Sequence, residues 1–330
     1  MLLSNLCQKR NGMIEFKSLS STPNETICNS HYYCDYIELL ALVDCDDGVS
    51  FSDVYDRFLE DEKIADIGTE NNGHTSEIWN SRINNWFSEV NSRATHYGDY
   101  YPFSFDGVRV KKKDNIEHIQ YIYICLLLSS LLKYLDGYHQ VTTIFEKLSY
   151  YALKKYLPQD AEVHVFGVSS DRSSKYIGSL ESKFTLLASD LGLTRSVRAN
   201  IFRPGDNGDG GIDIVAWIPF KDDPNLERKQ IFLGQSASGK NWSNKQASVD
   251  RVKNFLADLP DNAQNILFVP FDFRDADRNF CQNDEITASL IFDRHRIIRL
   301  IDIDDINNDI LSSSFQEVIN YALTFEEDIV

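Results

Sequence analysis

Apolar residues in the first part of the chain recur at helical spacing, and polar stretches separate the runs. Helices are expected over residues 31–43, 50–60 and 77–93. The second has Ser50 at its start, where a hydroxyl can accept a free amide hydrogen. Residues 103–112 read as a hairpin turning at an Asp-Gly pair. Three helices and a small hairpin are the elements of a winged-helix domain, and an ordinary helical domain explains the pattern about as well.

The later part of the chain mixes strand-like runs with helices. Helices are expected over residues 116–135, 143–157, 180–191 and 244–256. Strands are expected over residues 162–168, 196–202, 212–218, 230–236, 266–270 and 297–303. This mixture predicts an α/β (α+β) fold with a central mixed sheet flanked by helices. We place the main boundary near residue 140, between a mainly helical recognition or partner-binding domain (residues 1–140) and a sheet-containing domain (residues 141–330).

Composition narrows the class of protein. A content of 42% hydrophobic residues can form a sizeable core. The longest apolar run, residues 121–132, is shorter than the roughly 20 residues that a membrane span needs. The first ten residues are too short and polar for a signal peptide, so we expect a cytoplasmic protein without membrane contact. The six cysteines form no C-x-x-C pair, which favours reduced thiols.

The net charge of −17 counts against unaided, tight binding of naked DNA, because such binders usually carry a basic surface. It does not exclude a nuclease, since acidic residues gather at metal sites and a partner subunit can supply basic charge.

Candidate chemistry concentrates in residues 205–242. Asp213 begins one expected strand, and Gln235 lies on the next. Side chains of one parity on adjacent strands share a sheet edge, so these two can converge. A carboxylate from a preceding helix, Glu181 or its rival Glu146, can complete an oxygen-rich site that suits Mg²⁺ or Mn²⁺. Lys240, just beyond the second strand, can orient the attacking water or stabilise the developing anion.

The run Asp209-Gly210-Gly211-Ile212-Asp213 resembles the acidic-glycine motif of Mrr-like restriction endonucleases, in the PD-(D/E)XK nuclease superfamily. The resemblance implies a restriction-endonuclease-like core in which Asp213 binds the metal. The family's third motif is Glu or Gln, any residue, then Lys.

Gln235 matches the first position of that third motif, and Ala237 occupies the place of the lysine. The resemblance therefore implies that Lys240 replaces it from the following loop. Residues 234–242 also resemble defence-associated relatives in which Gln replaces the acid.

Other residues have less specific readings. Asp206 and Asp209 are expected to shape the glycine loop. Lys245 and Arg251, on the following helix, are candidate DNA-phosphate contacts. His295, between two arginines, could touch a phosphate, although a structural role is the simpler reading.

Together these observations lead us to expect a metal-dependent DNA endonuclease of a bacterial restriction or anti-phage defence system. Metal ligation is expected from Asp213, Glu181 or Glu146, and Gln235. A protein partner is expected, and a homo-oligomer is left open. The alternative is a catalytically inactive subunit that keeps the nuclease fold and binds protein or DNA within a defence complex. The neutral Gln235 and the displaced lysine favour that alternative.

Overall fold

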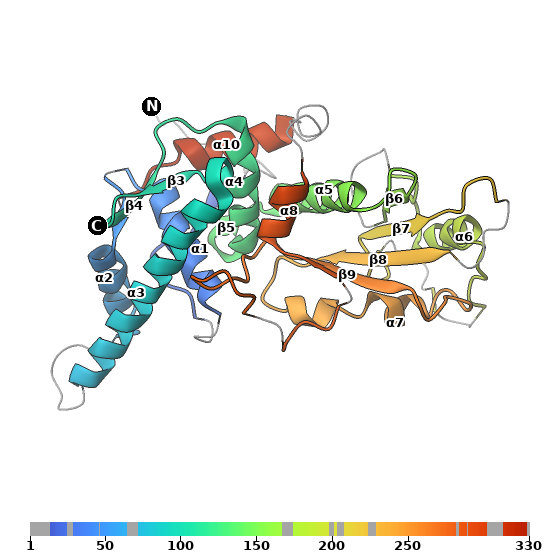
Figure 1. Ribbon diagram of the computed structural model, residues 1–330, viewed down its shortest axis with the longest axis horizontal. Helices are drawn as coiled ribbons and strands as arrows, with labels where there is room; N and C mark the ends of the chain where they lie inside the picture. Colours follow the sequence, from blue (N-terminus) through green and yellow to red (C-terminus); the bar gives the residue numbers. More distant parts are fainter. Residues whose placement is uncertain are drawn as a thin grey trace, which may run out of the picture.

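The computed structural model describes residues 14–24, 29–45, 47–64, 72–166, 174–197, 201–202, 208–223, 229–281, 284–288, 290–301 and 313–328. A helical part and a sheet-containing part lie side by side along the long axis of the molecule (Figure 1). None of the helices in the described part of the chain is both long and apolar enough to cross a membrane.

The larger sheet has five strands in the order β10-β9-β8-β7-β6. The pairs β6–β7 and β7–β8 are antiparallel, whereas β8–β9 and β9–β10 are parallel. The carboxyl ends of the three parallel strands therefore meet at one edge, which faces the helical part (Figure 1). The strands are β6 (Glu162–Val165), β7 (Ile214–Ile218), β8 (Gln230–Ser236), β9 (Gln264–Phe268) and β10 (Leu290–Phe292).

Alternation along the strands gives the sheet two apolar faces. Ile214, Ala216 and Phe232 join the main core, which includes residues of α5 (His139–Tyr156). Val215, Trp217, Ile231 and Leu233 join a second cluster, with α6 (Leu180–Leu191) and α7 (Ser248–Val252). Because both faces are covered, the strands can be almost continuously apolar.

The helical part contains the elements expected from the sequence. In chain order they are α1 (Ser30–Val43), β2 (Val49–Ser50), α2 (Phe51–Glu60), α3 (Asn72–Tyr97), β3 (Phe103–Phe105) and β4 (Arg109–Lys112). The three strands form an antiparallel sheet in the order β2-β4-β3. The predicted start of α2 is confirmed, because the hydroxyl of Ser50 accepts a hydrogen bond from the backbone amide of Asp53.

The remaining elements complete the helical part. The apolar helix α4 (His118–Ser130) is buried along most of its length. The last helix, α10 (Ser313–Thr324), packs against α1, α4 and α5, so both ends of the described chain contribute to one core. Short elements are β1 (Glu15–Phe16), which pairs with β5 (Leu135–Asp136), and the 3₁₀ turns η1 (Gly98–Tyr100), η2 (Leu132–Tyr134) and η3 (Trp242–Lys245).

Three expected elements differ in the structure. The strand expected over 297–303 is wrong, because residues 294–300 form helix α8 (Arg294–Leu300). Asp293 caps this helix by accepting a hydrogen bond from the amide of Arg296, and that local bond outweighs the β-branched run. The helix expected over 244–256 is reduced to η3 and the short α7. The strand expected over 196–202 is absent at its described residues, and Arg195, just before this range, makes an isolated bridge to Leu256.

A buried network of charged residues joins the two parts. Asp35 on α1 accepts hydrogen bonds from Arg93 on α3 and Arg294 on α8, both at 2.7 Å. Glu38 pairs with Arg93 at 2.9 Å, and Asp272, after β9, with Arg93 at 3.5 Å. Buried charges need such compensation, so the network holds α1, α3, α8 and the segment after β9 together.

Candidate functional site

Asp213 lies at the amino end of β7, where the glycine loop enters the sheet. Its backbone amide donates to the carbonyl of Gly234, and its carbonyl accepts from the amide of Phe166. The side chain is 7% exposed, and its Oδ2 accepts a hydrogen bond of 2.7 Å from the amide of Ser236. Asp213 is therefore fixed from both neighbouring strands.

The loop before Asp213 requires glycine at two positions. Gly210 and Gly211 have φ of +64° and +88°, where other residues are strained. A Cβ on Gly211 would approach Arg251 Cδ to 2.7 Å, and one on Gly210 would approach the Phe184 ring to 2.6 Å. Asp209 Oδ1 accepts a hydrogen bond from the amide of Gly211 and so holds the turn. The loop-shaping role expected for Asp209 is thus confirmed, whereas Asp206 lies outside the described residues.

Glu146 on α5 is the acid that the fold brings to Asp213. Burial raises the pKa of Glu146 to about 8; the carboxyls of Asp213 and Asp209 also raise it, and Lys245 lowers it. Burial likewise raises the pKa of Asp213 to about 7, opposed by its hydrogen bond from Ser236.

Glu181, the other candidate first acid, lies elsewhere. It is in the first turn of α6, its side chain is 55% exposed, and its carboxylate pairs with Arg195. It is not among the charges that shift the pKa of Asp213 or Glu146. The helix stripe that made Glu181 attractive packs onto the second apolar cluster, away from α5.

Gln235 lies beside Asp213, as the strand parity predicts. The register pairs Ile214 with Gly234, and its continuation sets Asp213 opposite Gln235. The buried amide of Gln235 accepts, through Oε1, a hydrogen bond of 3.0 Å from Arg251 Nη1. Arg251 also donates to the carbonyl of Asn244, so its side chain connects β8 to the turn that follows it.

The two lysines after β8 have different surroundings. Lys240 lines a cavity of about 170 Å³ together with Tyr32 of α1, Ser130 of α4 and Lys133. Lys245, at the end of η3, is the cation whose charge acts on both Asp213 and Glu146. The sequence pattern did not predict the 3₁₀ turn η3 after β8, at whose end Lys245 lies near Asp213 and Glu146.

The described residues contain no group of three or more His, Cys, Asp or Glu side chains arranged to hold a metal ion. The candidate site thus consists of two carboxyls, Asp213 and Glu146, close enough to Asp209 and Lys245 for those charges to shift the pKa of both.

No family model matches the chain, and searches of curated proteins and of solved structures find no significant match.

The raised pKa values predict how stability depends on pH. Unfolded carboxyls titrate near pH 4, whereas folded Asp213 and Glu146 keep their protons to about pH 7 and 8. The folded state binds more protons between these values, so the metal-free protein should lose stability as pH rises through this range. Urea unfolding from pH 5 to 9 measures this, and Asp213→Asn should show a shallower decline. An equal slope in wild type and variant would contradict the assignment.

Proposed function

We propose that this protein is a metal-dependent DNA endonuclease whose cation is held by Asp213 and Glu146. The observation that carries the proposal is the proximity of the buried Asp213 to the half-buried Glu146 on α5, since the charge of Asp213 helps to raise the pKa of Glu146 and burial raises the pKa of both. Burial makes the ionised form of both carboxyls unfavourable, and Lys245 offsets this only in part. A divalent cation would supply the missing charge, and oxygen ligands suit Mg²⁺ or Mn²⁺.

The arrangement of the sheet supports the resemblance to the PD-(D/E)XK superfamily. One acid comes from the helix α5 before the sheet, a second from the strand β7, and the third-motif residue Gln235 from the adjacent strand β8. The antiparallel β6-β7-β8 unit followed by α7 and the parallel β9 agrees with a restriction-endonuclease-like core. The sequence motif and this order of elements both support Asp213 as a ligand in the proposed metal site.

The chemistry assigns a separate task to each side chain. The bound cation would polarise the scissile phosphate and lower the pKa of a water molecule. Lys245 would stabilise the negative charge that develops on the phosphate, in place of the lysine absent at Ala237. Arg251 would keep Gln235 and the glycine loop in position through its hydrogen bond and its contact with Gly211.

DNA as the substrate and a role in restriction or anti-phage defence follow from the family resemblance. The order α1, β2, α2, α3, β3, β4 with its β2-β4-β3 sheet supports a winged-helix assignment for the helical part. A winged helix would recognise DNA or a partner protein beside the nuclease core.

Plasmid cleavage with Mg²⁺ or Mn²⁺, beside EDTA controls, tests the proposal. Glu146→Gln should reduce metal-dependent nicking at least about a hundredfold, because it removes a charged metal ligand. Glu181→Gln is the matched control, with the same chemical change on an exposed helix, and should cleave like wild type. Loss of activity in the Glu181 variant with retention in the Glu146 variant would reverse the assignment.

The second candidate function is a non-catalytic subunit with a nuclease fold. One observation favours it: the Oε1 of Gln235 already accepts a hydrogen bond from Arg251. Gln235 is then a poor metal ligand, and only the two carboxyls remain to hold a cation. Titration calorimetry with Mn²⁺ separates the two candidates. Binding that is lost in Glu146→Gln supports the enzyme, whereas no binding by the wild type supports the subunit.

A further inference from the structure

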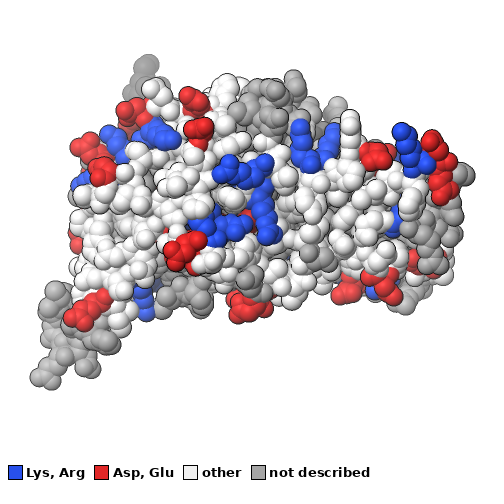
Figure 2. Space-filling view, viewed as in Figure 1, with Lys and Arg blue, Asp and Glu red and all other residues white. Residues whose placement is uncertain are grey.

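Four arginines gather on one face of a strongly acidic protein. We call Arg274, Arg278, Arg296 and Arg299, from the segment after β9 and from α8, the arginine surface. Figure 2 shows Lys and Arg side chains concentrated near the middle of this face, over the region of α8 in Figure 1.

Aromatic rings hold these arginines in place. The guanidinium groups of Arg274 and Arg296 both lie over the ring of Phe280, at 5.2 and 5.3 Å from its centroid. Arg278 lies over the ring of Tyr97 at 5.6 Å. Stacking restricts the rotation of the exposed Arg296 guanidinium, so less entropy is lost when it binds an anion. The side chains of Arg274 and Arg278 are only 15% and 8% exposed, so they contribute mainly through their charge.

The four arginines differ in how their charge is balanced within the described part of the chain. Arg274 pairs with Asp293 and Arg278 with Asp272. The exposed Arg296 and Arg299 instead donate to backbone carbonyls, of Ile291 at 2.7 Å and His96 at 2.6 Å, and form no salt bridge among the described residues.

His295 lies close to these arginines. Its pKa is lowered to about 4, mainly by burial; the charges of Arg274, Arg278 and Arg299 contribute to the lowering, and Asp272 opposes it.

Helix α3 adds a neutral polar stripe beside the arginine surface. Its exposed residues include Ser81, Asn84, Asn85, Ser88 and Asn91, none of which is charged. The same helix contacts the arginine surface directly, because Ser92 Oγ donates to the carbonyl of Ala276 and Arg299 donates to that of His96. Asn and Ser side chains can donate to and accept from base edges, and arginines contact phosphates.

We propose that the arginine surface binds the phosphate backbone of duplex DNA, with the stripe of α3 against a groove. This inference rests on the proposed function and names the surface that receives its substrate. Helix α8 also packs on α5, which carries Glu146, so bound DNA would lie beside the element that positions the acid. The surface offers the basic charge that the overall composition lacks, without a partner subunit.

DNA binding in EDTA tests this separately from cleavage. Fluorescence anisotropy with a labelled duplex of about 30 base pairs would compare wild type with the double variant Arg296→Gln/Arg299→Gln. Affinity should fall about tenfold, and the slope of log affinity against log salt should decrease by about two, because two phosphate contacts are lost. Neither residue belongs to the buried network or to the carboxyl pair, so the double variant should have the same unfolding midpoint as the wild type.

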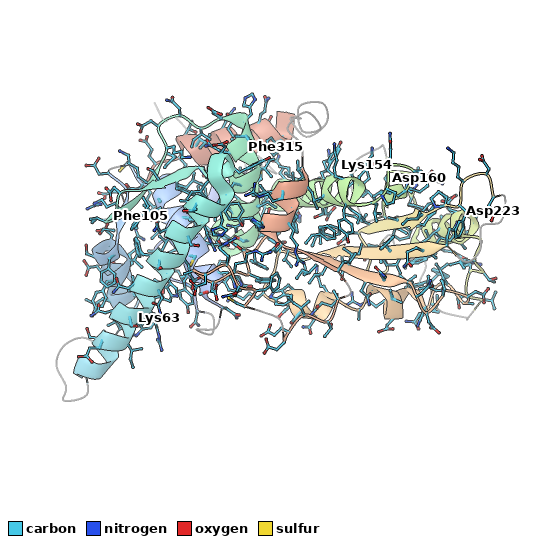
Figure 3. All side chains as sticks on the ribbon, in the orientation of Figure 1. Lys63, Phe105, Lys154, Asp160, Asp223 and Phe315 are labelled. Carbon is cyan, nitrogen blue, oxygen red and sulfur yellow. The ribbon has the colours of Figure 1, made fainter. Side chains whose placement is uncertain are left out.

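The matched control is Lys175→Gln/Lys221→Gln, which removes the same charge. Lys221 lies just before Asp223 in the β7–β8 turn, at the end of the sheet far from the helical part (Figure 3). Lys175 pairs with Asp190 at the end of α6. The control should bind DNA like wild type. An equal loss in both double variants would show a general charge effect, and wild-type affinity in the arginine variant would overturn the proposal.

Binding without cleavage, lost in the arginine variant, would support the surface even if the nuclease proposal fails. Absence of duplex binding by the wild type at about 50 mM salt would overturn the surface.

Discussion

Asp213→Asn is expected to abolish metal-dependent cleavage, with a loss of about a thousandfold or more. The substitution removes the negative charge at the centre of the site, and stabilisation of the phosphate by the cation contributes several kcal/mol. Single-turnover nicking of plasmid with Mg²⁺ or Mn²⁺ measures the loss.

The same variant should remain folded. Asparagine keeps an oxygen that can accept the hydrogen bond from Ser236, and it avoids a buried carboxylate above pH 7. We therefore expect an unfolding free energy at pH 8 at least equal to that of the metal-free wild type. Activity retained by a folded Asp213→Asn protein would refute the proposed site.

The second large effect concerns stability. Arg294→Met should lower the free energy of unfolding by about 3–5 kcal/mol, because Asp35 loses a buried partner. Arg294 is fully buried; it donates to Asp35 at 2.7 Å and to the carbonyl of Pro270 at 2.8 Å, and it lies over the Tyr123 ring. Urea unfolding at neutral pH, followed by circular dichroism, measures the change.

Arg296→Met is the matched control for this prediction. It lies two residues away on the same helix, is exposed, and forms no salt bridge among the described residues. Its loss should change stability by less than about 1 kcal/mol. Similar losses for the two variants would mean that the buried network contributes little beyond helix packing.

The network also has a consequence for function. Arg294 and Asp272 hold α8 and the segment after β9 against α1 and α3, and these segments carry the arginine surface. The relative placement of the arginine surface, the stripe of α3 and the carboxyl pair thus depends on one buried cluster of charges.

Local signals in the sequence determined much of the secondary structure. The Ser50 cap, the turn at Asp106-Gly107 and the end of α6 at Gly192 rest on hydrogen bonds and φ values set by neighbouring residues. The motif 209–213 indicated the glycine loop for the same reason, and strand parity put Gln235 beside Asp213.

Only the tertiary structure decided which distant residues lie close together in the proposed site. Glu146 and Glu181 look equivalent along the sequence, and it is the packing of α5 on the sheet that brings Glu146 to Asp213. Likewise, the turns after β8 set Lys240 at a cavity wall and Lys245 near the acids. Such choices depend on packing between elements far apart in the chain, which periodicity within one element does not encode.

In the segment 293–299 the local sequence pattern and the tertiary contacts favour different structures. Its β-branched run favoured a strand, but the cap by Asp293 and the burial of Arg294 among acids from α1 made it a helix. The sequence determined where charges and apolar residues occur along the chain. Tertiary structure decided which charges are buried together and which remain exposed, because that depends on partners contributed by other elements.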